Sequence, residues 1–306
     1  MVLPIRTECR SVVCHIILPA MKKRKLLLRS ALFFTVVCAL AAGDTGAELA
    51  RKVLRIRDNK VISFAQMIGE VKKADLVLVG EIHGNNEHHR VELDVLRAFH
   101  ESDTSTAVGL EMFRADSQGA LNAWIKGKLP ENEFMAVYLD NWPMPWPLYD
   151  SIFRYARVHE IPLIGLNISN AIAKKVAQQG FSSLSREERG QLPPGISCRV
   201  DRKYMEFIKK AYADHGLRDR QFVNFCEAQM VWDRAMAWRL SDYRKKNPGR
   251  TVVVLAGVGH AWKRGIPAGI ESESKLKSMV ILPLVPGQID RKTVTLSDAD
   301  YVLLDE

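Results

Sequence analysis

Short apolar runs alternate with longer amphipathic stretches along most of this chain, and this alternation constrains the fold more than any other feature. The runs lie at 76–79, 106–112, 161–166, 251–256 and 279–284. They are rich in Val, Leu and Ile, which is typical of parallel strands buried on both faces. Strands that alternate with helices predict an α/β fold with a mostly parallel sheet flanked by helices.

The stretches around these runs have helical patterns, at 63–73, 86–100, 115–126, 148–159, 169–179, 202–215 and 222–246. The last two belong to a helical insertion, at about 180–247, that precedes the last strands and includes the turn-forming Pro193-Pro194-Gly195. The chain has 306 residues, 47% of them hydrophobic, which is enough for one large core. We therefore expect residues 43–306 to form a single α/β domain.

Residues 1–42 have the pattern of a secretory signal peptide. Met21 opens a basic stretch at 22–25, an apolar run follows at 31–42, and small residues at 39 and 41 suit a cleavage site. The run is shorter than the roughly 20 residues that span a bilayer. We expect Met21 to be the true start and the protein to be exported, either free in the periplasm or anchored as a lipoprotein through Cys38. The anchor is the weaker alternative, because no small residue directly precedes Cys38.

Removal of this leader changes both the charge and the cysteine content. Seven of the 44 basic residues lie in the leader, which leaves 37 basic against 34 acidic residues in the rest of the chain. So small an excess gives no strong reason to bind nucleic acid. Only Cys198 and Cys226 remain of the five cysteines. In an oxidising compartment they would either form a disulfide or stay as buried free thiols.

Polar residues follow four of the apolar runs directly. Glu81 and His83 follow the first run, Glu111 lies at the end of the second, Asn167 follows the third and His260 follows the fourth. Because functional clefts in open α/β sheets lie beyond the carboxyl ends of the strands, we expect these side chains to converge. Taken singly, each would more often be a helix cap or a buried structural residue, but four strand ends together favour a site.

Imidazole and carboxylate groups in one place suit a divalent metal ion such as Zn or Mn, or acid–base chemistry on bound water. Both histidines lie in a GxxH motif, in which we expect Gly80 and Gly257 to form tight turns that direct His83 and His260 over the sheet edge. The usual signatures of serine hydrolases, P-loop NTPases, dinucleotide enzymes, HExxH proteases and covalently attached haem are missing from the sequence.

The segment at 138–149 contains four aromatic residues and three prolines. Because proline disfavours regular helix, we expect the aromatic side chains to lie on a stiff, extended segment. Such a segment either walls a flat apolar ligand, through Trp142 and Trp146, or packs on the core as a lid. Tyr138 and Tyr149 are phenols of the kind that ligate ferric haem in some proteins.

Five segments, in order and spacing, resemble the ChaN family of haem-binding uptake proteins. They are GEIHGN at 80–85, GLEMF at 109–113, the NWP…Y segment at 141–149, IPLIGLN at 161–167 and AGVGHAWKRGIP at 256–267. The resemblance covers roughly residues 50–285, and that family is similar in turn to the Tiki metalloproteases and the erythromycin esterases, which have paired GxxH motifs. It implies a bacterial envelope protein associated with iron acquisition that binds haem non-covalently.

For this chain, the resemblance implies a tyrosine on the haem iron, a homodimer with haem at its interface, and an outer-membrane haem or iron transport system as partner. We take Tyr149 as the first candidate ligand and Tyr138 as the second. Basic residues, Lys263 or Arg264, would pair with the haem propionates. Trp142 and Trp146 would contact the ring.

Two alternatives stay open beside haem binding. In the hydrolase relatives, the matching positions would form the metal or acid–base centre of a metal-dependent peptidase or esterase; in this chain they are Glu81, His83, Glu111 and His260. A binding module for another envelope protein, with a relic pocket, is the third possibility. We favour haem as the cofactor, with a divalent metal as the alternative.

Overall fold

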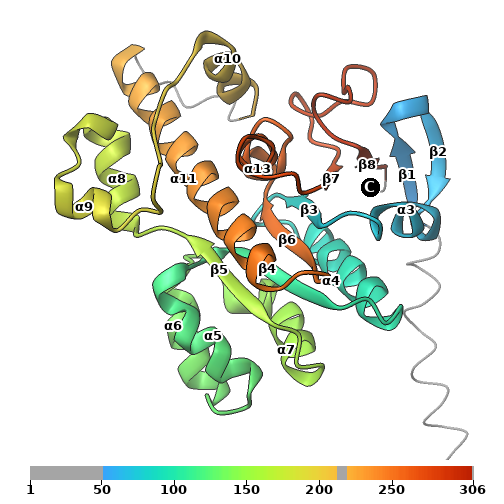
Figure 1. The fold of residues 1–306 in the computed structure, drawn as a ribbon. Helices are drawn as coiled ribbons and strands as arrows, with labels where there is room; N and C mark the ends of the chain where they lie inside the picture. The colour runs from blue at the N-terminus through green and yellow to red at the C-terminus, as the bar shows by residue number, and fades with distance from the viewer. Residues whose placement is uncertain (1–50, 212–218, 305–306) are drawn as a thin grey trace, which may run out of the picture. The chain divides into compact units, whose positions relative to one another are not determined.

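The computed structural model describes residues 51–211 and 219–304 (Figure 1). The predicted leader, including Met21 and Cys38, lies outside the described residues. Eight strands form one sheet in the order β2-β1-β8-β7-β3-β6-β4-β5. The strands are β1 (Lys52–Arg55), β2 (Lys60–Ser63), β3 (Leu76–Glu81), β4 (Thr106–Arg114), β5 (Leu163–Asn167), β6 (Thr251–Gly257), β7 (Ser278–Pro283) and β8 (Tyr301–Leu303).

Neighbouring strands from β8 to β5 are parallel, whereas β1 pairs antiparallel with both β2 and β8. The predicted α/β class, with a mostly parallel sheet, is therefore confirmed. The register brings Glu81, the last residue of β3, opposite Gly257, the last residue of β6. The ends of β3, β6 and β4 thus lie side by side, and we call this place the carboxyl edge.

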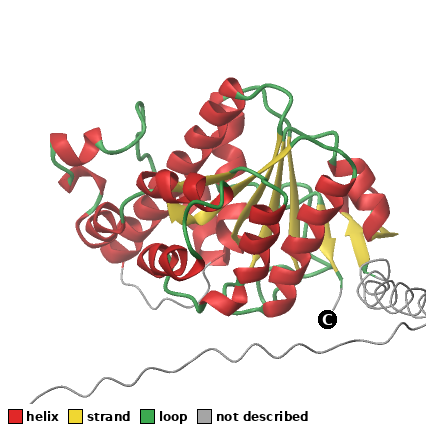
Figure 2. Cartoon of the chain, turned by 90° about the horizontal axis from the view of Figure 1, so that it is seen from below, coloured by secondary structure: helices red, strands yellow, loops and turns green. Residues whose placement is uncertain are grey.

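Helices cover both faces of the sheet (Figure 2). One layer packs into the core cluster of one face and consists of α3 (Phe64–Val71), α4 (Asn86–Glu101), α5 (Gln118–Ile125), α6 (Glu131–Asn141) and α7 (Asp150–Val158). The other layer consists of α10 (Arg202–Ala211), α11 (Asp219–Lys246), α12 (Val258–Ala261) and α13 (Ile266–Glu273). Beside them, α8 (Asn170–Gln179) packs with part of α11 around a third apolar cluster, to which Leu184 and Leu192 on either side of α9 (Arg186–Gly190) also belong.

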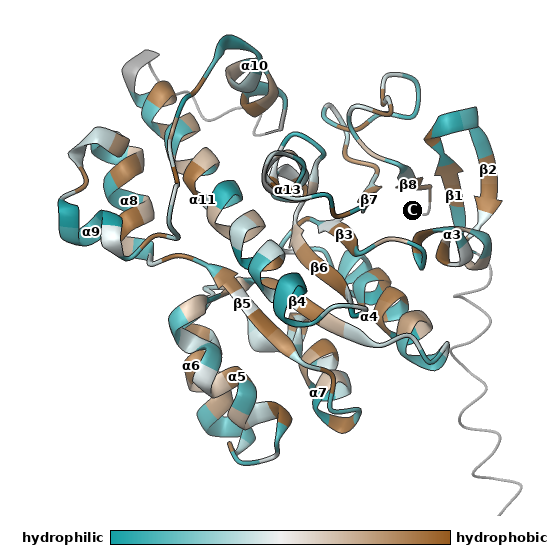
Figure 3. Cartoon of the chain, viewed as in Figure 1, coloured by the Kyte–Doolittle hydropathy of each residue, from teal (hydrophilic) through white to brown (hydrophobic). Residues whose placement is uncertain are grey.

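Burial on both faces explains why the strands contain so few polar residues. Leu76 and Leu78 of β3 pack into one core, and the intervening Val77 and Val79 pack into the other, because successive side chains of a strand point to opposite faces. All four are fully buried. Figure 3 shows the same contrast, with apolar residues along β6 and hydrophilic residues on α9.

The predicted helical insertion before the last strands is confirmed, since α9, α10 and α11 fall within 180–247. Short 3-10 helices join several elements, at η1 (Ile56–Asp58), η2 (Ala115–Ser117), η3 (Trp146–Leu148) and η4 (Phe181–Ser183). Within the described ranges, no helix has the length and apolar character needed to cross a membrane.

One local expectation needs correction, and the structure decides between two alternatives for the cysteines. The segment at 138–149 is not extended throughout: Tyr138 lies inside α6, and Trp146 begins η3. All three prolines come after α6 ends at Asn141, so none of them disturbs that helix. Cys198 and Cys226 do not form a disulfide but are free thiols, which is the other alternative that the sequence left open.

Candidate functional site

The polar residues of the strand ends meet at the carboxyl edge, as their positions predict. Glu81, Glu111, Asn167 and His260 surround a cavity of about 530 Å3, together with His83 from the turn after β3. We call this cavity the site pocket. Its other lining residues are Ile82, Met112, Arg114, Asn141, Trp142, Pro143, Asn170, Gln229, Trp232, Gly257, Val258, Gly259, Val285 and Gln288.

Glu81 and His83 form a bonded pair at one side of the site pocket. The Glu81 carboxylate is buried, whereas 41% of the His83 side chain is exposed. His83 Nδ1 shares a hydrogen bond with Glu81 Oε1. The bond at Nδ1 leaves Nε2 as the ring nitrogen that is available to a ligand. Tyr149 supports the pair, because its hydroxyl donates to Glu81 Oε1 at 3.2 Å.

Each member of this pair favours the charged form of the other. Burial by itself would raise the pKa of Glu81, but the hydrogen bond with His83 and the close approach of His89 lower it to about 2. Burial by itself would lower the pKa of His83, but the hydrogen bond with Glu81 and the negative charge of Glu111 raise it above its usual value. Glu81 is therefore a carboxylate at neutral pH, and it makes His83 a stronger base.

A second chain of polar contacts crosses the pocket from Glu111. Glu111 Oε2 accepts a hydrogen bond from the Gly257 backbone N–H at 2.6 Å, and Oε1 lies 3.6 Å from His260 Nε2. His260 Nδ1 lies 2.7 Å from Asp233 Oδ1, and Asp233 Oδ2 accepts from the Tyr204 hydroxyl at 3.1 Å. The chain thus holds His260 between two carboxylates.

His260 is buried between these carboxylates, and its pKa reflects both facts. Burial lowers the pKa, but the negative charges of Glu111 and Asp233 outweigh burial and raise it to about 9. The imidazole is therefore protonated at neutral pH and can donate a proton from either nitrogen. This arrangement resembles the carboxylate–histidine pairs that orient imidazoles in catalytic and metal sites.

Gly257 has a different role from the one that the GxxH pattern suggested. Its φ of −53° is open to any residue, so no special turn requires glycine here. A Cβ atom at this position would instead lie 2.7 Å from His83 Cε1. Glycine is needed because the imidazole approaches the backbone closely, and the same backbone N–H binds Glu111.

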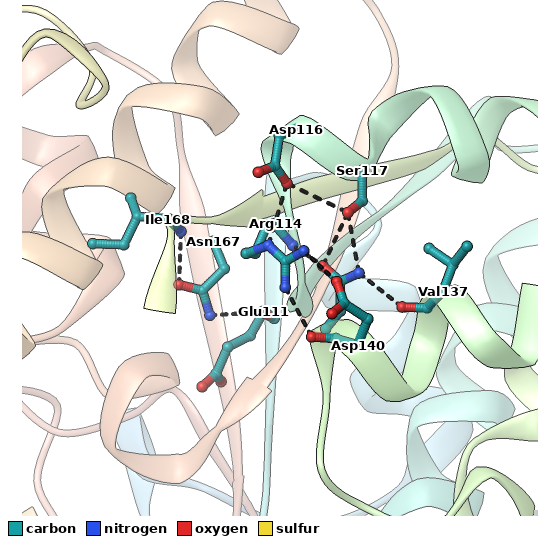
Figure 4. Close-up of polar contacts among 9 residues, drawn as sticks. Glu111, Arg114, Asp116, Ser117, Val137, Asp140, Asn167 and Ile168 are labelled. Carbon is teal, nitrogen blue, oxygen red and sulfur yellow. Dashed lines mark hydrogen bonds and ion pairs between the residues drawn. The ribbon is translucent and has the colours of Figure 1, made fainter. Parts of the chain in front are cut away.

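Figure 4 shows how the end of β4 is fixed beside the pocket. Asn167 Nδ2 donates to the Glu111 carbonyl oxygen at 2.8 Å, and the Arg114 backbone N–H donates to Asn141 Oδ1 at 2.9 Å. The Arg114 guanidinium pairs with Asp140 at 2.6 Å. In Figure 4 the Glu111 carboxylate points away from Arg114. Asn167 therefore acts on the Glu111 backbone rather than on the carboxylate.

The aromatic residues of 138–149 divide into one pocket residue and three core residues. Trp142 lines the pocket and makes an edge contact with the His83 ring, with the centroids 4.7 Å apart. Tyr138, Trp146 and Tyr149 are buried in the aromatic core beneath it. Burial raises the pKa of both tyrosines far above the usual value, and neither phenol lines the pocket. The structure thus does not present the tyrosines that were predicted as iron ligands.

The predicted propionate partners lie elsewhere too. Arg264 is exposed and lines a second cavity, beside α10 and α13, rather than the site pocket. Lys263 lines the same second cavity and pairs with Asp300 at 2.7 Å. After His260 the chain turns away from the site pocket and carries Lys263 and Arg264 with it. The spacing in the sequence does not show this turn.

Three buried residues that lie behind the site pocket were not predicted as site residues from the sequence. Asp233 lies in the middle of α11, far from any strand end. His89 and Glu92 lie on α4, and Glu92 is fully buried. The centroid of the His89 ring lies 4.1 Å from that of Tyr149, with the rings tilted by 39°, and His89 Nε2 lies 3.4 Å from Glu81 Oε2. The spacing of three between His89 and Glu92 along a helix places them on one face, which is the signal that was available.

The four predicted metal ligands, Glu81, His83, Glu111 and His260, all line the site pocket. Among the described residues, no three or more His, Cys, Asp or Glu side chains are grouped closely enough to hold a metal ion as they stand. The pocket therefore offers two separate arrangements. One is the exposed imidazole of His83, and the other is His260, which is hydrogen-bonded to Asp233 and lies at ion-pair distance from Glu111.

Comparison with known proteins identifies the family. Residues 67–270 match the family described as haem-binding uptake, Tiki superfamily, ChaN. Among solved structures, ChaN of Campylobacter jejuni, described for its cofacial haem binding, is 22% identical, with 83% of this chain and 96% of that chain covered and a TM-score of 0.65. No curated protein matches the sequence.

Two further solved structures are more distant. The type III effector HopBA1 is 13% identical, with 77% of this chain and 89% of that chain covered and a TM-score of 0.46. A mutant of the erythromycin esterase EreC, in its open conformation, is 12% identical, with 78% of each chain covered and a TM-score of 0.45. The family match extends over more than half of the chain, and the chain therefore belongs to the haem-binding uptake (ChaN) family of the Tiki superfamily.

Proposed function

We propose that this protein binds haem non-covalently in the site pocket, with His83 as the side chain that ligates the iron. The observation that carries the proposal is the arrangement of His83, which Glu81 holds at Nδ1 so that Nε2 is left for a ligand beside the Trp142 ring. Histidine is the commonest protein ligand of haem iron, and the family description names haem.

The walls of the pocket suit a flat, apolar molecule. Its volume of about 530 Å3 falls within the range of small-molecule sites. Trp142 and Trp232 contribute aromatic surface, Met112, Val258 and Val285 contribute aliphatic surface, and Ile82 is 42% exposed at the rim. When bound, haem would supply an iron centre and a broad apolar face.

The residues behind His83 prepare it for this role. Glu81 fixes the orientation of the imidazole and raises its basicity, as carboxylates commonly do for metal-bound histidines. The Tyr149 hydroxyl in turn donates to Glu81. Tyr149 thus acts as a positioning residue. For Tyr149 to ligate the iron instead, the start of α7 would have to move out of the core.

A haemin titration of the full chain tests the proposal, with the Soret band as readout. We expect saturable binding, and at least a tenfold loss of affinity with an altered Soret spectrum in His83→Ala. Tyr149→Phe should keep the histidine-type spectrum. His159→Ala, an exposed histidine away from the pocket, is the matched control and should bind as the unmodified chain does. A spectrum that changes in Tyr149→Phe and not in His83→Ala would overturn the assignment of the ligand.

We further propose that the bound haem is cargo for uptake in the cell envelope. The predicted leader supports export to the periplasm or a lipid anchor, and the family description supports uptake. A homodimer and an outer-membrane haem or iron transporter are the partners proposed for this role. Cell fractionation, and light scattering with and without haemin, test the location and the dimer; protein found only in the cytoplasm would contradict the uptake role.

A second function, hydrolysis of an ester or peptide, is favoured by one observation, the series Asp233–His260–Glu111. Its protonated imidazole and two carboxylates supply groups for acid–base chemistry on a water in the same pocket. Assays on ester and peptide substrates, with and without Zn or Mn, should then show activity that His260→Ala abolishes. Protein that binds haem and shows no such activity would leave haem binding as the function.

A further inference from the structure

A second cavity, also of about 530 Å3, lies on the other side of Asp233 from the site pocket. α10, α11 and α13 surround it, together with the loop at 263–265. We call it the basic cavity. We propose that it binds a small anion with a phosphate group, either a soluble phosphate compound or the headgroup of a phospholipid.

Cationic side chains are concentrated in this cavity. Its lining includes three acidic residues, Asp201, Asp233 and Glu271, and five basic ones, Arg199, Lys203, Arg234, Lys263 and Arg264. Basic and acidic residues are nearly balanced over the chain after residue 42, so the excess here is local. Asp233 offers little negative charge to a ligand, because its two oxygens are bonded to His260 and Tyr204.

Three of the five cations form neither an ion pair nor a side-chain hydrogen bond with another described residue. Lys263 pairs with Asp300, and Arg234 donates to the Ser272 hydroxyl. For Arg199, Lys203 and Arg264, no carboxylate of the described residues lies within ion-pair distance. These three come from different segments, the loop before α10, α10 itself and the loop before α13, and they meet at one concave surface. Cations gathered in a concavity attract an anion more strongly than scattered ones do.

The chemistry of the lining favours a compact, oxygen-rich anion. Two arginines offer paired N–H donors, which match the oxygens of a phosphate group, and Lys203 adds a point charge. Ser297, which carries a hydroxyl, also lines the cavity. The basic cavity has no tryptophan wall, unlike the site pocket, and so does not suit a flat apolar ring.

The two cavities share no lining residue, so the substitutions that test the anion site leave the lining of the site pocket unchanged. Lys203 and Arg264 also line a smaller neighbouring hollow, so the concave surface continues along α10. The other charged residues of this hollow are Glu206 and the ion pair of Lys210 with Asp298, at 3.7 Å. That continuity leaves room for a phosphate group that is attached to a larger molecule.

Isothermal titration of the full chain with inorganic phosphate, at 0.15 M salt, tests the soluble source. Sedimentation with vesicles of phosphatidylglycerol, against vesicles of phosphatidylcholine, tests the lipid source. We expect one saturable site, or selective binding to the anionic vesicles, that weakens at least tenfold in the double variant Lys203→Gln/Arg264→Gln. Arg186→Gln, which removes an exposed arginine from α9, is the matched control and should bind as before.

Thermal unfolding of both variants checks that they still fold. We expect both to unfold as the unmodified chain does, because the substituted side chains are exposed. Binding of free phosphate that the double variant loses assigns a soluble ligand to the cavity, and binding of anionic vesicles alone, with the same loss, assigns a lipid headgroup. Binding of neither probe, or binding that the double variant retains, overturns the proposal. Haemin affinity is unaffected in either case, so failure here is distinguishable from failure of the haem proposal.

Discussion

His83 depends on two neighbours that act in different ways. Glu81 holds one ring nitrogen, and Gly257 leaves the space that the ring occupies. The sequence predicted both histidines and both carboxylates of the pocket, because each follows an apolar run. It could not predict which nitrogen is bonded or how close the ring comes to the backbone, since these follow from contacts between β3 and β6.

The contact at Gly257 leads to a first prediction. In Gly257→Ala, the new Cβ would lie 2.7 Å from His83 Cε1, so the ring must turn away from Glu81. We expect haemin affinity to fall at least tenfold, and the free energy of unfolding to fall by about 1–3 kcal/mol from overpacking. Gly119→Ala is the control, because a Cβ there meets no atom within 4 Å. Unchanged haemin binding in Gly257→Ala would contradict the role given to His83.

Glu92 leads to a second prediction, about pH. It is fully buried without a hydrogen-bond partner among the described residues, and burial, with the negative charges of Glu81 and Glu111, raises its pKa well above the usual value. Because the folded pKa is the higher one, the neutral carboxyl contributes stability at low pH, and that stability is lost as the pH rises above the unfolded value near 4.5.

Glu92→Gln should remove this pH dependence, since the amide keeps the shape of the neutral carboxyl and cannot ionise. We expect the stability difference to shift in favour of the variant between pH 5 and pH 8, by up to about 1.4 kcal/mol per pH unit. Urea unfolding at several pH values measures it. A difference that stays constant with pH would show that Glu92 titrates normally in the folded protein.

At the scale of elements, the aromatic segment shows where prediction from sequence stops. From the prolines we predicted that 142–149 is not a regular helix, and the segment has only one 3-10 turn. We did not predict α6 from the sequence, although Phe134 and Tyr138 lie four residues apart on its buried face. The 3-10 turn buries Trp146 against Phe134 and Phe153, whereas Trp142 stays at the pocket. Which of two similar tryptophans packs inside depends on the path of the chain, which the sequence pattern does not fix.

The two tryptophans should therefore respond differently to the same change. Trp146→Ala should lower the free energy of unfolding by about 3–5 kcal/mol, because it leaves a cavity in the aromatic core. Trp142→Ala should cost less stability but weaken haemin binding several-fold, because its ring lines the pocket. Chemical denaturation and haemin titration of both variants measure this division. Equal loss of stability in the two would contradict it.

The long helix α11 explains why Asp233 could not be predicted. It packs against α8 and α13 as well as the sheet strand β5, so apolar residues occur on several of its sides. No single polar face then marks which acidic residue points inward. Asp233 is recognised only when the structure places it next to His260.

Over all the described residues together, the sequence predicted the parallel strands β3 to β7 and the edge of the sheet where the site lies. It missed β1, β2 and β8, which have only three or four residues each and extend the sheet at one side. Strands this short have too few residues to display a period. In addition, β1 and β8 pair across more than two hundred residues of chain, as Val53 with Leu303 shows.

A crystal structure of the haemin complex, with data collected at the iron absorption edge, would show whether haem lies in the site pocket with His83 on the iron. We expect an anomalous iron peak at bonding distance from His83 Nε2, with the haem ring against Trp142. An iron peak bonded to a tyrosine oxygen, or located outside the site pocket, would contradict the proposed haem site.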